Sequence, residues 1–213
     1  MNHNHQNNKK TPWVPILIIT LAVLALGYFL FKSSPQNANN QTAGDSMHGG
    51  SSDSTALNSW IGKPMPSIKL TDKDGKTYTA DSFKGKNTVL FFSEGLMCYP
   101  ACWNQIAQFG TDQRFNTDQI QAISVVVDSA SEWQKAISKM PDLAKAATLF
   151  DNGGNASRSL GLLSLPSSMH KGSLPGHTYI VLDKDGIVRY VNDDPNMAIA
   201  NDTLMNKIAE FNK

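Results

Sequence analysis

The sequence predicts an α/β protein in which helices flank a mixed β-sheet, preceded by one apolar segment near the N-terminus. Two runs of apolar, β-branched and aromatic residues, 88–93 and 120–128, have the composition of strands buried on both faces. The Asp-Gly dipeptides at positions 74–75 and 185–186 lie between alternating apolar residues and indicate hairpins. Strand-helix units that end in a hairpin and a terminal helix are typical of an α/β sandwich.

The size and charge of the chain restrict the function. It has 213 residues, with 19 Lys and Arg against 18 Asp and Glu, for a formal charge of +1. Outside the apolar segment and a polar stretch after it, enough chain remains for about one domain. No basic block extends beyond Lys9 and Lys10, so electrostatics do not favour nucleic-acid binding.

Residues 13–31 are predicted to form a transmembrane anchor. These 19 positions carry no charged residue, and a helix needs about 20 to cross the hydrocarbon core. No cleavage site of a secretory signal is clear, so we expect the anchor to be retained. Lys9 and Lys10 precede it and Lys32 follows it. The positive-inside rule then predicts a single-pass protein of the cell membrane, with residues 1–12 cytoplasmic and the domain extracytoplasmic.

Residues 32–56 are predicted to be a flexible linker, because they are rich in Ser, Asn, Gly and Gln and have few large apolar side chains. His3, His5 and the Met47-His48 pair are interpreted as solvated rather than as metal ligands. The folded domain is therefore expected to span residues 57–213.

Within this domain the elements are expected in a regular order. Ser129 with Glu132 has the spacing of a capping box and marks one helix start. The predicted strands are 67–71, 76–79, 88–93, 120–128, 147–150, 178–182 and 187–191, and the predicted helices are 100–109, 129–140, 155–160 and 196–211.

The only two cysteines, Cys98 and Cys102, follow the strongest predicted strand. Pro100 is tolerated in a first helical turn, which would place Cys98 at a helix N-terminus, where a thiolate is favoured. Residues four apart on a helix have Cα atoms about 6 Å apart, within reach of a disulfide. So short a loop gives little stabilisation, which favours redox chemistry over a structural bridge. We predict that Cys98 attacks and Cys102 resolves.

Several motifs resemble the redoxin branch of thioredoxin-like proteins, which includes the alkyl hydroperoxide reductase and thiol-specific antioxidant family and membrane-anchored thiol reductases. The resemblance covers about 57–213 and is carried by residues 62–67 (GKPMPS), 70–76 (LTDKDGK), 83–86 (FKGK), 89–92 (VLFF) and 179–186 (YIVLDKDG). It implies a thioredoxin-like fold with an N-terminal hairpin extension and a catalytic cysteine pair that needs no cofactor. The implied partners are protein disulfides or thiols and a membrane redox partner.

The chain departs from the patterns of these families in three ways. Its motif is Cys-x-x-x-Cys, where thioredoxin-type reductases have Cys-x-x-Cys. No threonine precedes the cysteines, and His177 stands where peroxiredoxins carry a distal arginine. Reductases of this fold place a cis-proline just before the strand predicted here at 178–182. His177 stands at that position, and Pro175 lies two residues earlier. The missing threonine and arginine argue against peroxidase chemistry, so the peroxiredoxin-like thiol peroxidase with antioxidant activity that the resemblance implies is the alternative and disulfide exchange the leading prediction.

A second alternative comes from the copper-delivering assembly factors of cytochrome oxidase, which the chain resembles in its Cys-x-x-x-Cys motif and distal histidine. That resemblance implies a copper site formed by Cys98, Cys102 and His177, since two sulfurs and an imidazole suit copper. The leading prediction remains a membrane-anchored, extracytoplasmic thiol-disulfide oxidoreductase, with the copper-binding chaperone and the peroxidase as alternatives.

Other polar residues receive lesser roles. Glu94 is a candidate proton acceptor for the second cysteine, and Trp103 is expected to pack the helix or to line a partner groove. Asp128 and Asp183 end strands and are expected to set turns, whereas His170 has no apparent ligand partner. The absence of phosphate-loop, His-Glu-x-x-His and Gly-x-Ser-x-Gly motifs argues against phosphoryl transfer and serine hydrolysis.

Overall fold

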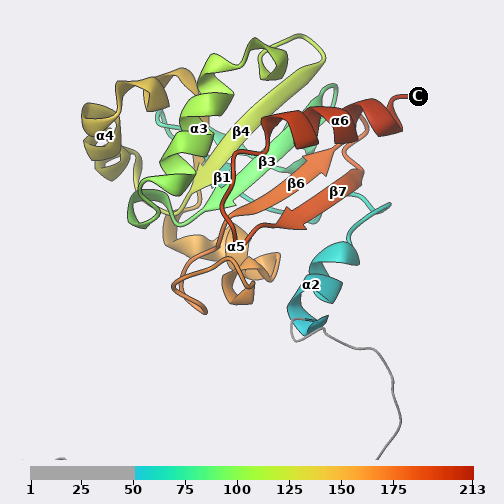
Figure 1. Cartoon of the computed structure of the whole chain (residues 1–213), viewed down its shortest axis with the longest axis horizontal. Coiled ribbons are helices and arrows are strands. Elements are labelled where there is room, and N and C mark those ends of the chain that lie inside the picture. Colours follow the sequence, from blue (N-terminus) through green and yellow to red (C-terminus); the bar gives the residue numbers. More distant parts are fainter. Residues whose placement is uncertain (1–50) are drawn as a thin grey trace, which may run out of the picture. The chain divides into compact units, whose positions relative to one another are not determined.

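The computed structural model describes residues 51–213, with side chains from residue 55 onward (Figure 1). The predicted cytoplasmic tail, the predicted anchor and most of the predicted linker lie outside these residues. Within residues 51–213, no helix has both the length and the apolar character needed to cross a membrane.

A seven-stranded mixed sheet forms the centre of the described domain, in the order β2-β1-β5-β4-β3-β6-β7. Strand β3 pairs in parallel with β4 and antiparallel with β6, so it lies in the interior of the sheet, as its apolar sequence predicts. The strands are β1 (Leu70–Thr71), β2 (Thr77–Tyr78), β3 (Asn87–Ser93), β4 (Ile120–Val126), β5 (Ala147–Phe150), β6 (Thr178–Leu182) and β7 (Val188–Asp193).

Helices cover both faces of this sheet. The α-helices are α2 (Ser51–Asn58), α3 (Ala101–Thr111), α4 (Ala130–Lys139), α5 (Asn155–Ser159) and α6 (Asn201–Phe211). Short 3-10 helices lie between them: η1 (Ala80–Phe83), η2 (Gly95–Met97), η3 (Gln113–Phe115), η4 (Pro141–Lys145), η5 (Asn152–Gly154) and η6 (Leu162–Ser164). Helices α3 and α6 lie across the same face of the sheet (Figure 1).

Alternation along β3 divides the core in two. Val89 and Phe91 pack with residues of α3, α4 and α6, whereas Leu90 and Phe92 pack on the other face with residues of α2 and α5. Successive residues of a strand point to opposite faces of the sheet, and helices cover both faces here. All four side chains are therefore fully buried. The side of β3 that carries Phe91 also carries the cysteines.

The local sequence signals identify most of these elements. The dipeptides at 74–75 and 185–186 form the turns of the β1–β2 and β6–β7 hairpins. The capping box at the start of α4 is confirmed, since the Ser129 hydroxyl accepts from the Glu132 N–H while the Glu132 carboxylate accepts from the Ser129 N–H. Strand β4 ends at Val126, two residues earlier than predicted.

The first strand is shorter than predicted, since β1 has only Leu70 and Thr71, and larger differences concern the predicted linker and the terminal helix. Residues 51–56, which were assigned to the flexible linker, belong to helix α2, which ends at Asn58 and buries Leu57 to 3% exposure in the core. The terminal helix begins at Asn201 rather than at residue 196. The Asp194 carboxylate accepts from the N–H groups of Asn196 and Ala198 at 3.0 Å each, which forms a turn before the helix.

The connection from η6 to β6 packs tightly onto itself, a feature that the sequence did not predict. A Cβ atom on Gly176 would lie 2.0 Å from the Ser167 Oγ and 2.4 Å from the Ser168 nitrogen. Only glycine fits against this backbone. Because His177 follows directly, this close contact fixes where β6 begins.

Candidate active site

Cys98 and Cys102 form a disulfide in which the Cα atoms are 5.4 Å apart, as the spacing predicts. Cys98 caps the end of η2, and Cys102 is the second residue of α3, which begins at Ala101 instead of Pro100. The Cys102 N–H donates to the Cys98 carbonyl at 3.0 Å. The disulfide therefore spans one turn of backbone at the N-terminal end of α3.

The η2 turn before the disulfide is held by two side-chain hydrogen bonds and requires glycine at position 95. The Asp128 carboxylate accepts from the Leu96 N–H at 2.9 Å, and the Trp103 indole N–H donates to the Gly95 carbonyl at 3.1 Å. Gly95 has a φ of 62°, and a Cβ atom there would lie 1.8 Å from the Asp128 carboxylate. Burial raises the pKa of Asp128 above its usual value. Asp128 thus sets a turn, as expected, and this turn directs Cys98.

His177 lies against the second cysteine. Its Nδ1 atom is 3.4 Å from the Cys102 Sγ, and the ring is fully buried with its edge toward Phe91. The backbone N–H of His177 donates to the Ser167 hydroxyl at 2.7 Å, and the backbone carbonyl of His177 accepts from the Asp194 N–H at 2.9 Å. The backbone on both sides of the ring is therefore fixed.

Hydrogen bonds on the far side of the ring assign its tautomer. The Ala200 N–H donates to the Gln105 Oε1 at 2.8 Å, so this atom is the amide oxygen. The Tyr179 hydroxyl donates to the same oxygen at 3.0 Å, and its own oxygen lies 2.7 Å from the His177 Nε2. Because the tyrosine has one proton, its oxygen accepts from Nε2–H. The Nδ1 lone pair of His177 then faces Cys102.

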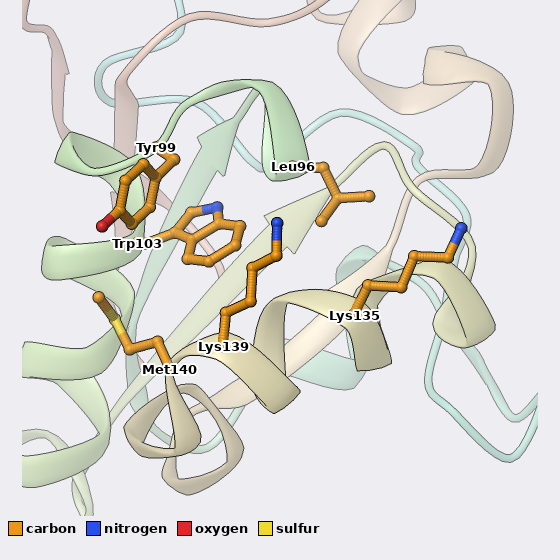
Figure 2. A pocket seen from close by; sticks show the side chains of 6 residues that line it. All are labelled: Leu96, Tyr99, Trp103, Lys135, Lys139 and Met140. Carbon is orange, nitrogen blue, oxygen red and sulfur yellow. The ribbon is translucent and has the colours of Figure 1, made fainter.

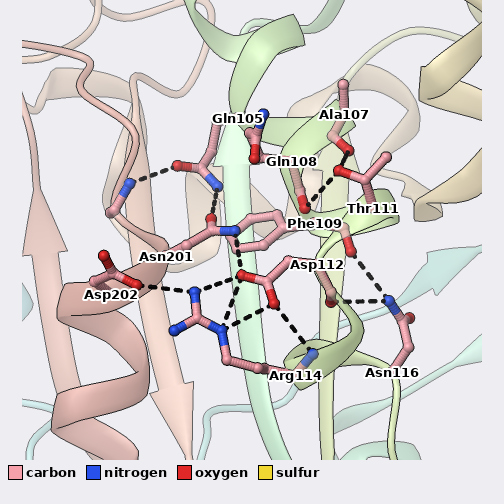
Figure 3. Close-up of polar contacts among 11 residues, drawn as sticks. Gln105, Ala107, Gln108, Phe109, Thr111, Asp112, Arg114, Asn116, Asn201 and Asp202 are labelled. Carbon is pink, nitrogen blue, oxygen red and sulfur yellow. Dashed lines mark hydrogen bonds and ion pairs between the residues drawn. The ribbon is translucent and has the colours of Figure 1, made fainter.

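This hydrogen-bond chain continues to the surface (Figure 3). The Gln105 Nε2 donates to the Asn201 Oδ1 at 2.8 Å, and the Asn201 Nδ2 donates to the Asp112 carboxylate at 2.9 Å. Arg114 bonds Asp112 and also pairs with Asp202. The Arg114 guanidinium is the main cause that lowers the pKa of Asp112 to about 2. Because a carboxylate only accepts, it fixes the orientation of both amides.

The imidazole at the disulfide is neutral at physiological pH. Burial lowers the pKa of His177 to about 4, against the smaller opposing effects of the Asp194 charge and a hydrogen bond with the Ala198 backbone. Burial also raises the pKa of Tyr179 well above its usual range. A neutral imidazole with a free Nδ1 lone pair is a hydrogen-bond and proton acceptor.

A groove of about 490 Å³ lies beside the disulfide (Figure 2). The Trp103 ring packs edge to face against Tyr99 and Trp133, with centroid distances of 4.9 and 6.1 Å. Trp103 therefore both packs the helix and lines the groove, the two roles considered from the sequence. The groove is lined by Leu96, Tyr99, Trp103, Lys135, Lys139 and Met140.

Glu94, the candidate proton acceptor for Cys102, contacts the loop before β6 instead. Its buried carboxylate accepts from the N–H groups of Met169 and His170 at 2.7 and 3.1 Å, and pairs with the His170 ring at 2.9 Å. The group beside Cys102 is His177, whereas Glu94 anchors the loop before β6. His170, for which the sequence showed no partner, is paired with this carboxylate.

Pro175 does not take the cis-proline role. The one cis peptide bond within residues 51–213 joins Tyr99 to Pro100, between the cysteines. His177 occupies the position directly before β6. Asp183 sets a turn as expected, since its carboxylate accepts from the N–H groups of Asp185 and Ile187 at 2.9 Å each.

Sequence reasoning missed the polar residues that orient the imidazole. Tyr179 lies two residues after His177 and shares its side of the strand, but it reads as one more aromatic residue of a buried run. Gln105 and Asn201 read as ordinary polar positions on helices. A glutamine among apolar residues on the buried face of a helix was the available signal, since a buried amide requires partners.

The family comparison agrees with this site. The profile of the Redoxin family matches residues 61–205. A chloroplastic peroxiredoxin Q from Triticum aestivum is 33% identical over 136 residues, which cover 61% of this chain and 57% of the relative. The thiol-disulfide oxidoreductase ResA of Bacillus thuringiensis subsp. konkukian (strain 97-27) is 29% identical over 129 residues, which cover 60% of this chain and 66% of that protein.

Solved structures support the fold. A peroxiredoxin-like protein from Aquifex aeolicus superposes with a TM-score of 0.57 at 20% identity, over 70% of this chain and 86% of that one. The region that aligns with the peroxiredoxin Q relative covers 57% of that relative, little more than half of its length. With a thioredoxin-like sheet and a cysteine pair at the start of α3, and with the family profile matched over most of its domain, this chain belongs to the Redoxin family.

Proposed function

We propose that this protein is a thiol-disulfide oxidoreductase that uses Cys98 and Cys102 as its redox pair. The observation that carries the proposal is the asymmetry of the disulfide: the neutral His177 ring, with its Nδ1 atom 3.4 Å away, lies against Cys102. A group that accepts a proton from one cysteine alone is suited to a pair in which one sulfur attacks and the other resolves.

The reaction begins with the reduced pair. The Cys98 thiolate attacks a sulfur of a partner disulfide, which forms a mixed disulfide and releases the first partner thiolate. The Cys102 thiol donates a hydrogen bond to His177 Nδ1, which takes up the thiol proton as the Cys102 sulfur attacks the Cys98 sulfur. This step closes the Cys98–Cys102 bond and releases the second partner thiolate. The Cys102 proton then passes from His177 to one of the partner thiolates, and the other thiolate takes its proton from water. The partner thus gains two electrons, and the protein loses two electrons and one proton.

Exposure does not distinguish the two cysteines, since they are 2% and 0% exposed in the disulfide form. The assignment of roles rests on their neighbours. Cys98 follows the η2 turn and adjoins Tyr99, which is exposed, whereas Cys102 faces the buried His177. A partner can therefore approach Cys98 from solvent, while the base serves Cys102 from the core.

A thiol peroxidase is the second candidate, and the 33% identity to a peroxiredoxin Q favours it. In that reaction a cysteine thiolate would attack a peroxide, forming a sulfenic acid and releasing water, and the second cysteine would condense with it. A cation near the thiolate would stabilise the leaving oxygen. All three arginines bond other groups: Asp112 and Asp202 for Arg114, Asn155 for Arg158, and Asp183 for Arg189. The geometry therefore favours disulfide exchange.

Copper binding is a further candidate, because the Cys98, Cys102 and His177 donor atoms all lie within 4.8 Å of one another. These donors suit copper once the disulfide is reduced, since a thiolate and not a disulfide sulfur is the ligand. The bond from Tyr179 to Nε2 leaves Nδ1 as the ring atom available to a metal.

For location we propose a single-pass membrane protein with this domain extracytoplasmic and a membrane redox partner as electron source. The uncharged segment 13–31 supports this placement, and so does a cysteine pair that is oxidised. A tether would raise the effective concentration of the domain near membrane partners.

The test uses the full-length chain, fully reduced, with a protein disulfide, with hydrogen peroxide and with Cu(I) in separate reactions. We expect rapid loss of both thiols with the protein disulfide and slow loss with peroxide. The Cys102→Ser variant should trap a mixed disulfide at Cys98, whereas the Cys98→Ser variant should not. Fast oxidation by peroxide would favour the peroxidase, and tight Cu(I) retention with no exchange would favour the copper candidate.

A further inference from the structure

Apolar exposure on the described domain is concentrated around the disulfide. Of the five large apolar side chains that stay exposed within the described residues, three belong to this region: Met97 at 58%, Tyr99 at 65% and Met169 at 59%. Met97 and Tyr99 flank Cys98 directly. The Met169 N–H donates to Glu94, which immediately precedes η2. A patch of this kind at a reactive bond indicates a contact surface.

The groove extends this surface toward α4. Tyr99 follows Cys98 and Trp103 follows Cys102 in the chain, so two of its lining residues adjoin the two sulfurs. Leu96 and Met140 add apolar surface, and Figure 2 shows the Trp103 ring extending toward Lys139. A chain whose sulfur reaches Cys98 would lay its neighbouring side chains against these rings.

Two lysines give the groove a positive rim. Lys135 and Lys139 lie one turn apart on α4 and are both exposed. Within residues 55–213, neither forms an ion pair with a carboxylate. Glu132, on the same helix, is hydrogen-bonded to Ser129 in the capping box. Glu132 interacts electrostatically with Lys135 without forming an ion pair, so the rim keeps a positive charge that can act on a ligand.

We propose that this groove binds a segment of the substrate protein next to its disulfide, with an aromatic or other large apolar residue against Tyr99 and Trp103 and an acidic residue at Lys135 and Lys139. This inference rests on the proposed function and names its substrate class. Charge complementarity acts mainly on the rate of association, so selectivity is expected in the second-order rate constant and is reduced by salt.

The test compares two peptides of equal length, each with one cysteine blocked as a neutral disulfide with 2-mercaptoethanol. One carries Phe and Asp beside the cysteine, and the other carries Phe and Lys. The reduced full-length chain should react about 10-fold faster with the acidic peptide at low salt, and about 1 M salt should remove most of this preference. Tryptophan fluorescence and thiol loss report the rate.

Matched variants locate the effect. The double variant Lys135→Gln and Lys139→Gln should lose the preference, whereas Lys63→Gln with Lys69→Gln, which removes two exposed lysines elsewhere that form no ion pair, should keep it. Equal rates for the two peptides, or a preference that persists in the groove variant, would overturn the inference. Displacement of the acidic peptide by oleate, with no selectivity among peptides, would also overturn it in favour of an amphiphile.

A separate substrate keeps this inference distinct from the proposed function. Bis(2-hydroxyethyl) disulfide has no side chains for the groove to bind, so failure of the reduced chain to react with it would count against exchange itself. In that case, non-reactive thioether versions of the two peptides still test the groove through binding. Selective binding of the acidic version would support the groove, and equal binding would reject it.

Discussion

Lowering the pH should destabilise this protein through His177. The fold holds the ring neutral with a pKa of about 4, against about 6.5 for an exposed histidine. The unfolded chain therefore binds more protons than the native one between these two values. Stability contributed by the neutral ring is fully present above about pH 6.5 and is lost as the pH falls through about 4.

The size of this effect follows from the difference between the two pKa values. About 2.5 units at about 1.4 kcal/mol each give an upper limit near 3.5 kcal/mol of unfolding free energy lost as the pH falls from neutral through about 4. Asp112 does not contribute in this interval. Its pKa of about 2 provides stability that is present above about pH 3.8 and is lost as the pH falls toward 2.

The assay is chemical denaturation of the oxidised full-length chain at a series of pH values, with tryptophan fluorescence as the signal. The His177→Gln variant should lose most of the slope between pH 6.5 and pH 4, whatever its stability at neutral pH. His170→Gln is the matched control, because this ring is 42% exposed and bonds Glu94. An unchanged slope in His177→Gln would refute the reasoning that burial holds the ring neutral.

Three substitutions test other parts of the site. Tyr179→Phe removes the acceptor of Nε2–H, so resolution of a trapped mixed disulfide should slow about 10-fold in stopped-flow measurements while the first attack keeps its rate; equal slowing of both steps would contradict this. Glu94→Gln weakens the charge-assisted hydrogen bonds to residues 169 and 170, so protease should cut the loop before β6 faster. The free energy of unfolding should also fall by about 1–3 kcal/mol. Unchanged cleavage would count against the anchoring role. Gly95→Ala places a Cβ atom 1.8 Å from the Asp128 carboxylate at positive φ, so we expect a loss of about 2–4 kcal/mol in denaturation, and a neutral result would show that the η2 turn adapts.

The sequence predicted well those features that depend on neighbouring residues. The buried strand runs, the Asp-Gly hairpins and the Ser129–Glu132 capping box are local signals, and each identifies its element. The predicted start of the last helix was wrong because the Asp194 turn competes with helix formation. Helix α2 was not predicted, because its first residues are polar and were assigned to the linker, whereas Leu57, the first residue of the predicted domain, is buried in the core.

The site itself depends on contacts that no local pattern contains. His177 and Cys102 are separated by 75 residues and meet because β6 runs antiparallel to β3, with Thr178 opposite Phe92. This register brings the start of β6 to the end of β3 from which the cysteines follow. Glu94 was predicted to act near the cysteines from its place in the sequence, but the loop that it anchors returns to it from 75 residues away.

Three polar side chains are buried in the core beside His177, and their hydrogen bonds explain how the fold accommodates them. Burying Tyr179, Gln105 and Asn201 brings a desolvation cost that apolar side chains of similar size would avoid, and each of the three is hydrogen-bonded in compensation. The chain that they form runs from the His177 ring to the Asp112 carboxylate near the surface. Its effect is to fix which ring nitrogen faces Cys102.

The two sides of the disulfide therefore serve different needs. On the core side, a rigid hydrogen-bond chain orients an acceptor toward Cys102. On the solvent side, Tyr99 and the groove beside Cys98 leave apolar and positively charged surface uncovered. This separation suits the proposed exchange reaction, because the sulfur that meets a partner and the sulfur that resolves the mixed disulfide then have different surroundings.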